Sequence, residues 1–573
     1  MKRKHIPSLL LAIILLITMT GCGGTAVPAA TASASTAAST AASADGTAAS
    51  ESTEPVASAD GPFTKYDPGI EIHVIRTVDD TTKYLAGEDI NNNCWSRLYQ
   101  DELGITLAYD WIASTSNQYD EKLNVNIASG TLPDILSVNK AQLARLAKTE
   151  LINKDLGGVY DQYASDLTKG IMTQEGTTAL DSARFDGTLI AIPNTGSSMD
   201  SAPMMWLRQD WLDALGLKAP KTYDELLAVI DAFTTKDPAG TGAKDYVGLA
   251  LNKDLVGGYA GYEGFCNIFH AYPGTWIDDG TGRLVNGSYR PEMRTALLRL
   301  QELYKAGKID KEFAVKDGGK VSELAVSDKN GVQFGQMWNP LWPLQANRDK
   351  NPKADWIAYP LPSGDDKPAT PQVAFGTAQY YVVRAGYEHP EALLKMINQF
   401  TQKAWGGTNE DYATYLNPTI DGVMYEAHKY VFAMTWPARK NLDNYLAIVD
   451  AFKNNDTAKL NPEQLTNYNT VKTFKAGDDK GWGMARVFGE EGSFRTMNEY
   501  VSGNRLLQNA FYGADTPTMT TKGSSINKLE IETFTKIIMG APIEDFDKFV
   551  EKAMQLGGKA MEDEVNAWYA TAK

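Results

Sequence analysis

Strand-like and helix-like segments alternate at the start of the folded region, and this feature most constrains the fold. Residues 69–76 alternate apolar and polar side chains as a strand does, and residues 104–111 and 134–138 have the pattern of two further strands. Helix-like stretches at about 93–103 and 117–129 separate them. Such alternation predicts βαβ units, because parallel neighbours need a crossover connection. We therefore expect an α/β fold with mostly parallel sheets flanked by helices.

The length of the chain predicts more than one core. Its 573 residues are 43% hydrophobic and 22% charged, an ordinary composition for globular protein. A single hydrophobic core stops growing at roughly 250–300 residues. Two lobes are therefore the simplest expectation.

The charge balance disfavours polyanionic partners. The chain has 71 acidic and 55 basic residues, for a net charge of −16. Acidity of this size repels phosphate backbones and anionic lipid surfaces, so we expect no nucleic-acid partner. Clustered lysines or arginines in a cleft would overrule this expectation for a small anionic ligand.

Three cysteines, Cys22, Cys94 and Cys266, are too few for a disulfide scaffold. A disulfide between Cys94 and Cys266 would need the two residues to meet across a long separation, which the sequence does not decide. Two unpaired buried thiols are the expectation.

A short motif in the first strand–helix region resembles a family signature. The segment IASGTLPDIL at residues 127–136 places Gly130 where a helix ends, Pro133 in the turn and Asp134 before a strand. It resembles the "iasGxlPDil" signature of family 1 extracellular solute-binding proteins. The segment FDGTLIAIP at residues 185–193 is similar to that family's hairpin and first crossover.

A block near residue 210 extends the resemblance. The segments WLRQDWL at 206–212 and PKTYDEL at 220–226 resemble consecutive parts of one family motif. Thr222 is the expected helix cap there, and Glu225 would complete a capping box.

Further matches follow in the same order along the chain. They are KAGKID at 305–310, GVQFGQMW at 331–338, YYVVR at 380–384 and PEA at 390–392. The C-terminal segments 534–540, 544–549 and 566–569 resemble the large lipoprotein subgroup of Gram-positive bacteria. The resemblance thus covers nearly the whole folded region.

The resemblance implies a two-lobed, periplasmic-binding-protein-like fold of type II, with several chain crossings forming the hinge and the ligand between the lobes. Lobe 1 is expected at 63–193 with about 376–436, and lobe 2 at 194–375 with about 437–573. We name as the crossings the segments near Ile192–Gly196, Val373–Ala378 and Trp436–Lys440.

The first 21 residues have the pattern of a signal peptide. A basic start, Lys2 to Lys4, precedes an apolar run at 9–19 that is too short to span a bilayer. The residues before Cys22 look like a bacterial lipobox, in which the cysteine is acylated. A plain signal peptide with an incidental cysteine is the alternative.

Residues 22–62 begin with Cys22 and continue as a linker of alanine, serine, threonine and glycine. Such a composition buries no apolar face, so we expect disorder and a span of about 35 Å. No later segment has the length and apolarity of a membrane span. We therefore expect a protein anchored by lipid at the extracellular face of the cell membrane.

Aromatic residues are the candidate ligand-binding groups. The apolar face of a sugar ring stacks on an aromatic plane, while its hydroxyls need planar polar partners. Trp338 and Asn339 are our first choice, because the family places a ligand-facing aromatic there. Trp276 and Tyr259 lie in loops rich in glycine or proline that suit the rim of a cleft. All of these could instead pack within a core or hold a loop down.

Two further candidates lie near expected turning points of the chain. Trp436 and Arg439 would supply a stacking plane and a guanidinium at the third crossing. Asp79 follows the first strand, where strand C-termini face ligand in such folds. The alternatives are a structural role in the hinge and a solvated turn.

The segment Asp237–Asp245 resembles a calcium loop of relatives. Ala239 and Thr241 stand where that pattern has Asp or Asn. Calcium prefers six to eight oxygen ligands, largely carboxylates. We therefore expect no metal and no other cofactor.

Catalytic motifs are missing from the sequence. It has no HExxH, CxxC, GxSxG or P-loop segment. We therefore expect a binding protein and not an enzyme. Paired glycosidase carboxylates need no local signature, so a surface-anchored polysaccharide-degrading enzyme is the alternative.

The resemblance implies the substrate-binding lipoprotein of an ABC importer, a monomer that delivers an oligosaccharide to the transmembrane subunits of a permease. A non-transport sugar sensor or an adhesin would share most of these features. The abundance of aromatics, with 12 Trp and 27 Tyr, favours sugars over amino acids, and a peptide ligand stays open.

Overall fold

The computed structural model describes residues 60–421 and 423–572. The predicted signal peptide 1–21, Cys22 and the linker as far as residue 59 lie outside the described residues. Their predicted roles stay predictions.

Two large hydrophobic cores are present in the described part of the chain. The first core takes its residues from 72–192 and 380–433, and the second from 199–373 and 442–565. The chain therefore leaves the first core, builds much of the second, returns and leaves again. Residues 60–573 nevertheless form one compact unit, so the predicted lobe boundaries stay a prediction.

The first core is built on a five-stranded sheet in the order β2-β1-β3-β13-β6. β1 pairs in parallel with β2 and β3, while β13 is antiparallel to both β3 and β6. The bounds are β1 Ile70–Thr77, β2 Ile105–Ala113, β3 Ile135–Asn139, β6 Ile192–Asn194 and β13 Gln379–Val383.

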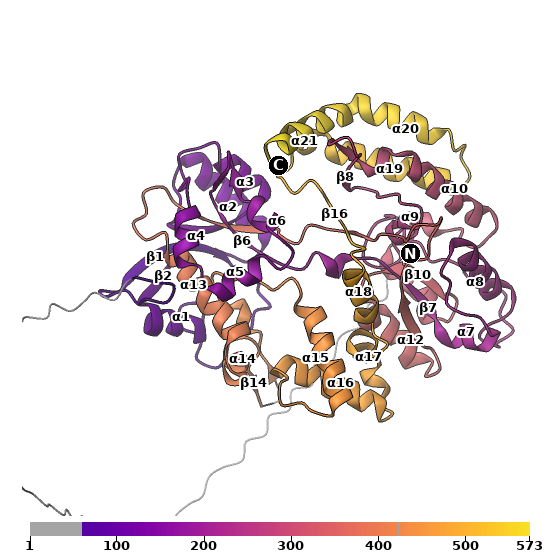
Figure 1. Ribbon diagram of the computed structural model, residues 1–573, viewed down its shortest axis with the longest axis horizontal. Helices are drawn as coiled ribbons and strands as arrows, with labels where there is room; N and C mark the ends of the chain where they lie inside the picture. The colour runs from indigo at the N-terminus through magenta and orange to yellow at the C-terminus, as the bar shows by residue number, and fades with distance from the viewer. Residues whose placement is uncertain (1–59, 422, 573) are drawn as a thin grey trace, which may run out of the picture. The chain divides into compact units, whose positions relative to one another are not determined.

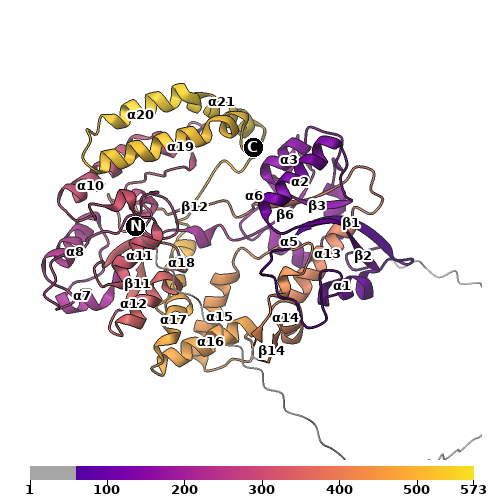
Figure 2. The ribbon, with the colours of Figure 1, turned by 180° about the vertical axis from the view of Figure 1, so that it is seen from behind.

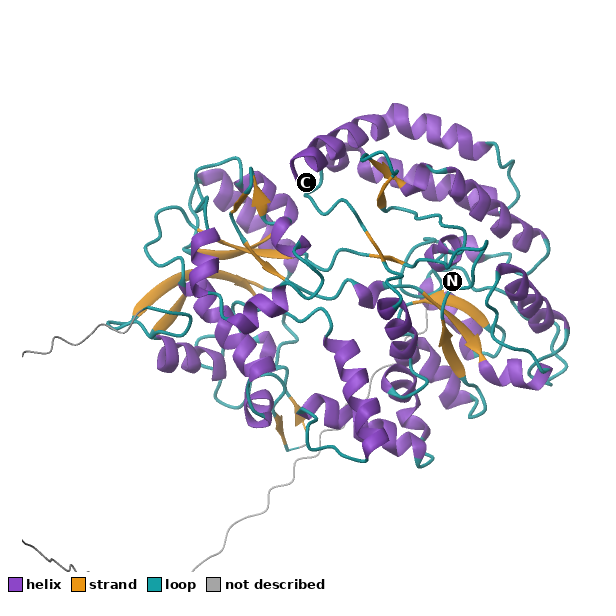
Figure 3. Cartoon of the chain, viewed as in Figure 1, coloured by secondary structure: helices purple, strands orange, loops and turns teal. Residues whose placement is uncertain are grey.

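The helices and remaining strands of the first core surround this sheet (Figures 1 and 3). The helices are α1 Cys94–Leu98, α2 Ser116–Ser129, α3 Lys140–Leu146, α4 Gly157–Tyr163, α5 Asp166–Met172, α6 Thr178–Asp181, α13 Ala392–Thr401 and α14 Asn409–Tyr415. Two short hairpins complete it, β4 Arg184–Phe185 with β5 Thr188–Leu189, and β14 Thr419–Ile420 with β15 Val423–Met424.

The second core is built on a three-stranded sheet in the order β10-β7-β11. Both neighbours are antiparallel to the central strand. The bounds are β7 Met204–Arg208, β10 Val332–Gly335 and β11 Trp356–Tyr359. Two small pairs accompany it, β8 Trp276–Asp278 with antiparallel β9 Leu284–Asn286, and β12 Gln372–Val373 with parallel β16 Leu507–Gln508.

Helices form most of the second core. They are α7 Gln209–Leu215, α8 Tyr223–Thr235, α9 Glu263–Asn267, α10 Pro291–Lys305, α11 Gly318–Val326, α12 Gln345–Lys350, α15 Lys440–Asn454, α16 Pro462–Lys475, α17 Trp482–Phe488, α18 Ser493–Ser502, α19 Pro517–Ile538, α20 Asp545–Ala553 and α21 Lys559–Ala572. The C-terminal helices α19 and α20 lie beside each other, and α19 lies beside α10 (Figures 1 and 2).

Shorter helical turns connect these elements. They are η1 Tyr99–Leu103, η2 Met199–Ser201, η3 Gly287–Tyr289, η4 Phe313–Val315, η5 Pro340–Leu344, η6 Gln402–Gly406, η7 Ala427–Lys429, η8 Asp479–Gly481 and η9 Met554–Gly558.

A buried ion cluster fixes the central strand of the second core. Arg208 at the end of β7 is fully buried and pairs with Asp210 at 2.7 Å and with Asp328 at 2.5 Å. Its guanidinium also lies 4.5 Å from the centre of the Trp211 ring. Removing one partner of such a buried cluster typically costs about 3–5 kcal/mol.

The α/β fold class is confirmed, with one correction to the sheets. We predicted mostly parallel pairing, but the second sheet is antiparallel and the first is mixed. β13 joins β3 only after the chain has traversed much of the second core. The direction in which so distant a strand returns is set by tertiary packing, which local periodicity does not encode.

Local predictions from the sequence are confirmed. The capping box of α8 forms between Thr222 and Glu225. Gly130 ends α2 with φ of 74°, the left-handed conformation that glycine adopts without steric cost.

Candidate functional site

A cavity of about 240 Å³ lies in the second core, where β10 ends and β7 begins. Its lining combines glycines, amide side chains, small residues, one carboxylate and one aromatic ring. The lining residues are Ser201, Pro203, Gly257, Gly261, Glu263, Gly264, Pro273, Gly274, Thr275, Phe334, Gly335, Gln336, Gln372, Val373, Ala374 and Asn509. No lysine, arginine or histidine is among them.

A glycine-rich loop at 257–264 forms one wall of the cavity. It is tied to β10 by the hydrogen bond from the Ala260 amide to the Phe334 carbonyl, at 2.9 Å. Gly264 lies so close to Phe334 that a Cβ there would sit 2.7 Å from the ring. At Gly335 a Cβ would sit 2.0 Å from Asn339 Oδ1. Glycine is needed at both positions because no side chain fits.

Amide side chains hold the other walls. Gln372 Nε2 donates to the Pro273 carbonyl at 2.9 Å and to Thr275 Oγ1 at 3.0 Å. Asn509 Oδ1 accepts from the Trp276 amide at 3.1 Å. Gln336 Nε2 donates to the Ser201 carbonyl at 3.2 Å. These bonds join segments that are far apart in sequence, so the cavity exists only in the folded chain.

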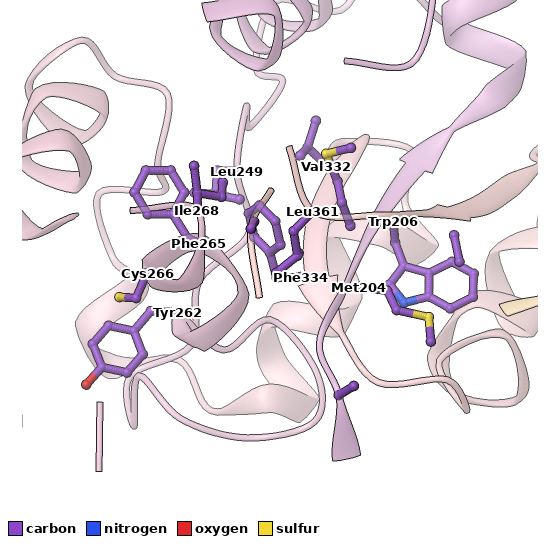
Figure 4. Packing of buried hydrophobic residues seen from close by; sticks show 14 of the residues in the cluster. Met204, Trp206, Leu249, Tyr262, Phe265, Cys266, Ile268, Val332, Phe334 and Leu361 are labelled. Carbon is purple, nitrogen blue, oxygen red and sulfur yellow. The ribbon is translucent and has the colours of Figure 1, made fainter. Parts of the chain in front are cut away.

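Glu263 is the one charged residue of the lining. It is the first residue of the short helix α9, and its Oε1 accepts a hydrogen bond from the Gly257 amide at 2.8 Å. Burial disfavours the ionised form and raises the pKa of Glu263 to about 7. Figure 4 shows Phe265 of the same helix, whose ring centre lies 6.1 Å from that of Phe334 on β10. The site therefore has a carboxyl group that titrates near neutral pH.

Three predicted residues lie next to the cavity without lining it. Asn339 is fully buried and donates from Nδ2 to the Gly258 carbonyl at 2.8 Å. Tyr259 is also buried, and an isolated bridge joins it to Gly335. Trp338 is half-buried and donates from Nε1 to Gln336 Oε1 at 2.8 Å. These residues therefore contact residues of the cavity lining and of the 257–264 loop and are not themselves part of the lining.

An exposed ring extends this aromatic group. Trp342 is 47% exposed, and its ring centre lies 6.1 Å from that of Trp338 and 5.4 Å from that of Tyr259. The sequence reasoning did not select Trp342.

The other predicted residues lie elsewhere. Trp276 is buried against Phe511, and its backbone amide donates to Asn509 Oδ1 of the lining. Trp436 packs on the first core, and Arg439 pairs with Asp443 at 3.0 Å. Asp79 is exposed and caps its own turn through Thr81. Their roles in ligand binding stay predictions.

The crossings meet one another through hydroxyl groups and glycines. The Oγ1 atoms of Thr195 and Thr435 are 2.6 Å apart, and Thr195 Oγ1 also donates to the Trp436 carbonyl at 2.9 Å. A Cβ at Gly376 would lie 2.6 Å from the Gly196 carbonyl oxygen. The chain segments therefore touch backbone to backbone here.

Asp200 lies just beyond the first crossing. Its Oδ2 accepts from Asn441 Nδ2 at 2.7 Å, whereas its buried Oδ1 has no hydrogen-bond partner among the described residues. Burial raises the pKa of Asp200 to about 6.

A second group missed by the sequence reasoning lies at the end of β3. Lys140 Nζ lies 4.0 Å from the centre of the Phe375 ring, and that ring lies 6.1 Å from the ring of Tyr512. Burial lowers the pKa of Lys140 to about 8. A lysine after a strand and a phenylalanine in a crossing gave no motif by which to find them.

Both carboxylates of the Asp237–Asp245 loop have partners within the protein. Asp237 accepts hydrogen bonds from the Gly242 amide at 2.7 Å and from the Tyr246 hydroxyl at 2.5 Å. Asp245 pairs with Lys329. Within residues 60–421 and 423–572, no group of three or more His, Cys, Asp or Glu is placed to hold a metal. The expectation of no calcium stays a prediction.

Two further observations concern the described residues. Cys94 and Cys266 are both buried and unpaired. No helix between residues 60 and 572 is long and apolar enough to cross a bilayer.

Comparisons with known proteins place the chain among the bacterial extracellular solute-binding proteins. Residues 77–407, more than half of the chain, match the profile of the bacterial extracellular solute-binding proteins. The polygalacturonan/rhamnogalacturonan-binding protein YtcQ of Bacillus subtilis is 26% identical over 57% of this chain and 62% of its own length. The lipoprotein LipO of the same organism is 24% identical over 82% of this chain and 87% of its own length.

FusA of Streptococcus pneumoniae, a fructooligosaccharide ABC transporter substrate-binding protein, is 28% identical over 44% of this chain and 47% of its own length. The structure of FusA in complex with kestose aligns with 87% of this chain and 99% of that chain, with a TM-score of 0.53 and 17% identity. This structural likeness shows a shared fold. The chain spans less than two thirds of the lengths of YtcQ and FusA.

Proposed function

The chain belongs to the bacterial extracellular solute-binding proteins, and we propose that it is the substrate-binding lipoprotein of an ABC importer that captures an extracellular oligosaccharide. YtcQ and FusA, which it resembles, are both named for binding saccharides, and FusA is named as part of an ABC transporter. Because these relatives are named as binding proteins, we propose binding without catalysis.

The cavity in the second core is the observation that carries this proposal. Its walls offer backbone groups, planar amides and a carboxylate, the partners that orient the hydroxyls of a sugar. Pockets that enclose a whole drug-sized ligand measure about 300–1,000 Å³. The smaller cavity here suits one ring of a longer chain, with the rest outside.

The crossings suggest how binding is signalled. We propose that ligand contacts both cores only in a closed arrangement, so that ligand shifts the population toward it. The contacts of Thr195 with Thr435 and Trp436 join residues of the first and third predicted crossings, and they support a change of arrangement there. Scattering from the purified protein should show compaction with saturating ligand, and an unchanged radius would contradict closure.

Calorimetry with a panel of oligosaccharides tests the proposed function. We expect saturable heat at a ratio of one ligand per chain, and a melting temperature that rises with ligand concentration by mass action. The same mixtures should contain no new products after incubation. Product formation would identify an enzyme, and binding by peptides alone would reject the saccharide class.

We also propose that Cys22 carries the lipid anchor and that the protein is a monomer without bound calcium. LipO, which matches 82% of this chain, is named as a lipoprotein. Labelling of cells with a palmitate analogue should mark the protein, and Cys22→Ala should remove the label and release the protein from membranes. Light scattering checks the monomer, and ligand titration with and without a calcium chelator checks the metal.

A further inference from the structure

The lining of the cavity is polar but carries a single ionisable side chain. Glu263 is its one ionisable lining residue, and the amides around it are neutral. A lysine or arginine in the wall would offset a negative charge on Glu263, and the lining contains neither. Any ligand group inside therefore meets a neutral or negative wall and never a positive one.

Glu263 is placed to contact what enters. One carboxylate oxygen, Oε1, is held by the Gly257 amide at 2.8 Å. The other, Oε2, lies over Gly261, where a Cβ would be only 2.2 Å away. No side chain of the described residues donates a hydrogen bond to this carboxylate. Gly257 and Gly261 carry no side chains, so the carboxylate lies directly against the loop backbone, and Glu263 is among the residues that line the cavity.

A second glutamate of similar acidity gives a matched comparison. Glu530 on α19 does not line the cavity. Its Oε1 accepts from Ser288 Oγ at 2.9 Å and from the Tyr262 hydroxyl at 3.5 Å. Burial raises the pKa of Glu530 to about 7, as it does for Glu263. The two differ in what they face, and this difference separates a ligand-contacting role from a structural one.

We propose that Glu263 makes this cavity a subsite for an uncharged, hydroxyl-bearing sugar ring and excludes rings that carry a carboxylate. The inference rests on the proposed function and specifies its substrate class. In this respect the protein would differ from YtcQ, which is named for binding polygalacturonan, a polymer of uronate rings. A sugar hydroxyl can donate to Glu263 Oε2, while the amide walls orient the ring. A uronate would bring a second negative charge beside Glu263 with no cation in the lining to offset it, and like charges so placed are strongly unfavourable.

Because Glu263 can bind a proton, the preference for neutral rings over uronates should depend on pH. The titratable groups that interact with it are Tyr262 and Cys266, and Glu530 interacts with these two residues in turn. Burial holds the pKa of Tyr262 and of the Cys266 thiol well above their usual values, so both stay neutral near pH 7. Below pH 7 Glu263 gains a proton, and its neutral carboxyl can donate to a uronate. Discrimination against uronates should therefore weaken from pH 8 to pH 6.

Calorimetry on the purified protein with matched trisaccharides tests the inference. The probes are 1,4-linked trimers of galactose, glucose and mannose, each paired with the trimer that differs only in a carboxylate at C6. We expect at least one neutral trimer to bind. At pH 8 its uronate partner should bind at least about tenfold more weakly, and this gap in affinity should narrow at pH 6. Glu263→Gln should abolish both the gap and its pH dependence.

Glu530→Gln is the control, and it should leave the gap and its pH dependence as in the wild type. In Glu263→Gln the side-chain oxygen can still accept from the Gly257 amide, and an unchanged melting temperature verifies that Glu263→Gln is folded. A uronate that binds as tightly as its neutral partner, or a gap that survives Glu263→Gln, would overturn the inference while leaving saccharide binding intact. Absence of binding by all six probes would also overturn it, and would reject the proposed function only if the wider panel failed too.

Discussion

The cavity and the crossings share a short stretch of chain, yet they are held in different ways. Ala374 lines the cavity and belongs, like Gly376, to the crossing near Val373–Ala378. The cavity is fixed by amide side chains bonded to backbone, within one core. The crossings are held by a hydroxyl pair and a glycine contact beside the buried carboxyl of Asp200. The cavity wall therefore depends on amide side chains, whereas the crossings depend on hydroxyl groups and close backbone contacts.

The largest effect is expected from filling the cavity wall with Gly335→Ala. The new Cβ would lie 2.0 Å from Asn339 Oδ1 and 2.8 Å from the Gly258 carbonyl oxygen. Relieving this overlap breaks the bond from Asn339 to Gly258, so we expect the free energy of unfolding to fall by about 2–3 kcal/mol. Thermal and urea denaturation measure it. Gly170→Ala, with no atom within 4 Å of the new Cβ, should not destabilise.

Equal losses from Gly335→Ala and Gly170→Ala would break the comparison, because the wall would then have no special need for glycine.

The hydroxyl pair of the crossings should have the next largest effect. Thr195→Val keeps the shape of the side chain and leaves Thr435 Oγ1 and the Trp436 carbonyl without this partner. We expect a loss of about 1–2 kcal/mol in the free energy of unfolding. Thr435→Val should cost a similar amount, and the double variant less than their sum. Additive losses would show that the two hydroxyls act separately.

Asp200 should make the crossings sensitive to pH. Its pKa is raised to about 6 in the folded chain, from an ordinary value of 3.8. The folded state therefore binds more protons between these values, and stability should fall as pH rises from about 4 to 6. Asp200→Asn should be more stable than the wild type by about 1–2 kcal/mol at pH 7 and equal to it near pH 4. Asp161→Asn, at an exposed position on α4, should show no such difference.

The smallest effect is expected where the first core meets a crossing. Phe375→Leu removes the ring that lies 4.0 Å from Lys140 Nζ and keeps an apolar side chain. Loss of this cation–π contact should cost about 0.5–1 kcal/mol in the free energy of unfolding. In a Lys140→Met background the same substitution should cost less. A full cost in that background would show that packing, and not charge, holds Phe375.

Much of the fold followed from local patterns. The strands β1, β2 and β3 and the helix α2 lie within a residue or two of the predicted segments. The capping box at Thr222 and the glycine end of α2 formed as expected. Each depends on residues within one or two turns of one another. The antiparallel return of β13 depends on the whole second core, and the prediction of mostly parallel sheets was wrong there.

The site was predictable only in part. The glycine-rich loop around Tyr259 and the strand before Trp338, both named from the sequence, lie at the cavity, and their role in ligand binding stays a prediction. Glu263, Gln372 and Asn509 were not found, because each is unremarkable among its neighbours in sequence. Asn509 reaches the cavity through a bond to the Trp276 amide, 233 residues away in the chain.

The sequence by itself determined the family, the local turns and caps, and the strands and helices that alternate at the start of the folded region. These depend on steric and hydrogen-bonding preferences of neighbouring residues, which any context preserves. Only the tertiary structure decided which side chains meet at the cavity and left Glu263 as its one charge. Burial, and with it the raised pKa of Glu263, comes from atoms supplied by distant segments, so it has no local pattern in the chain.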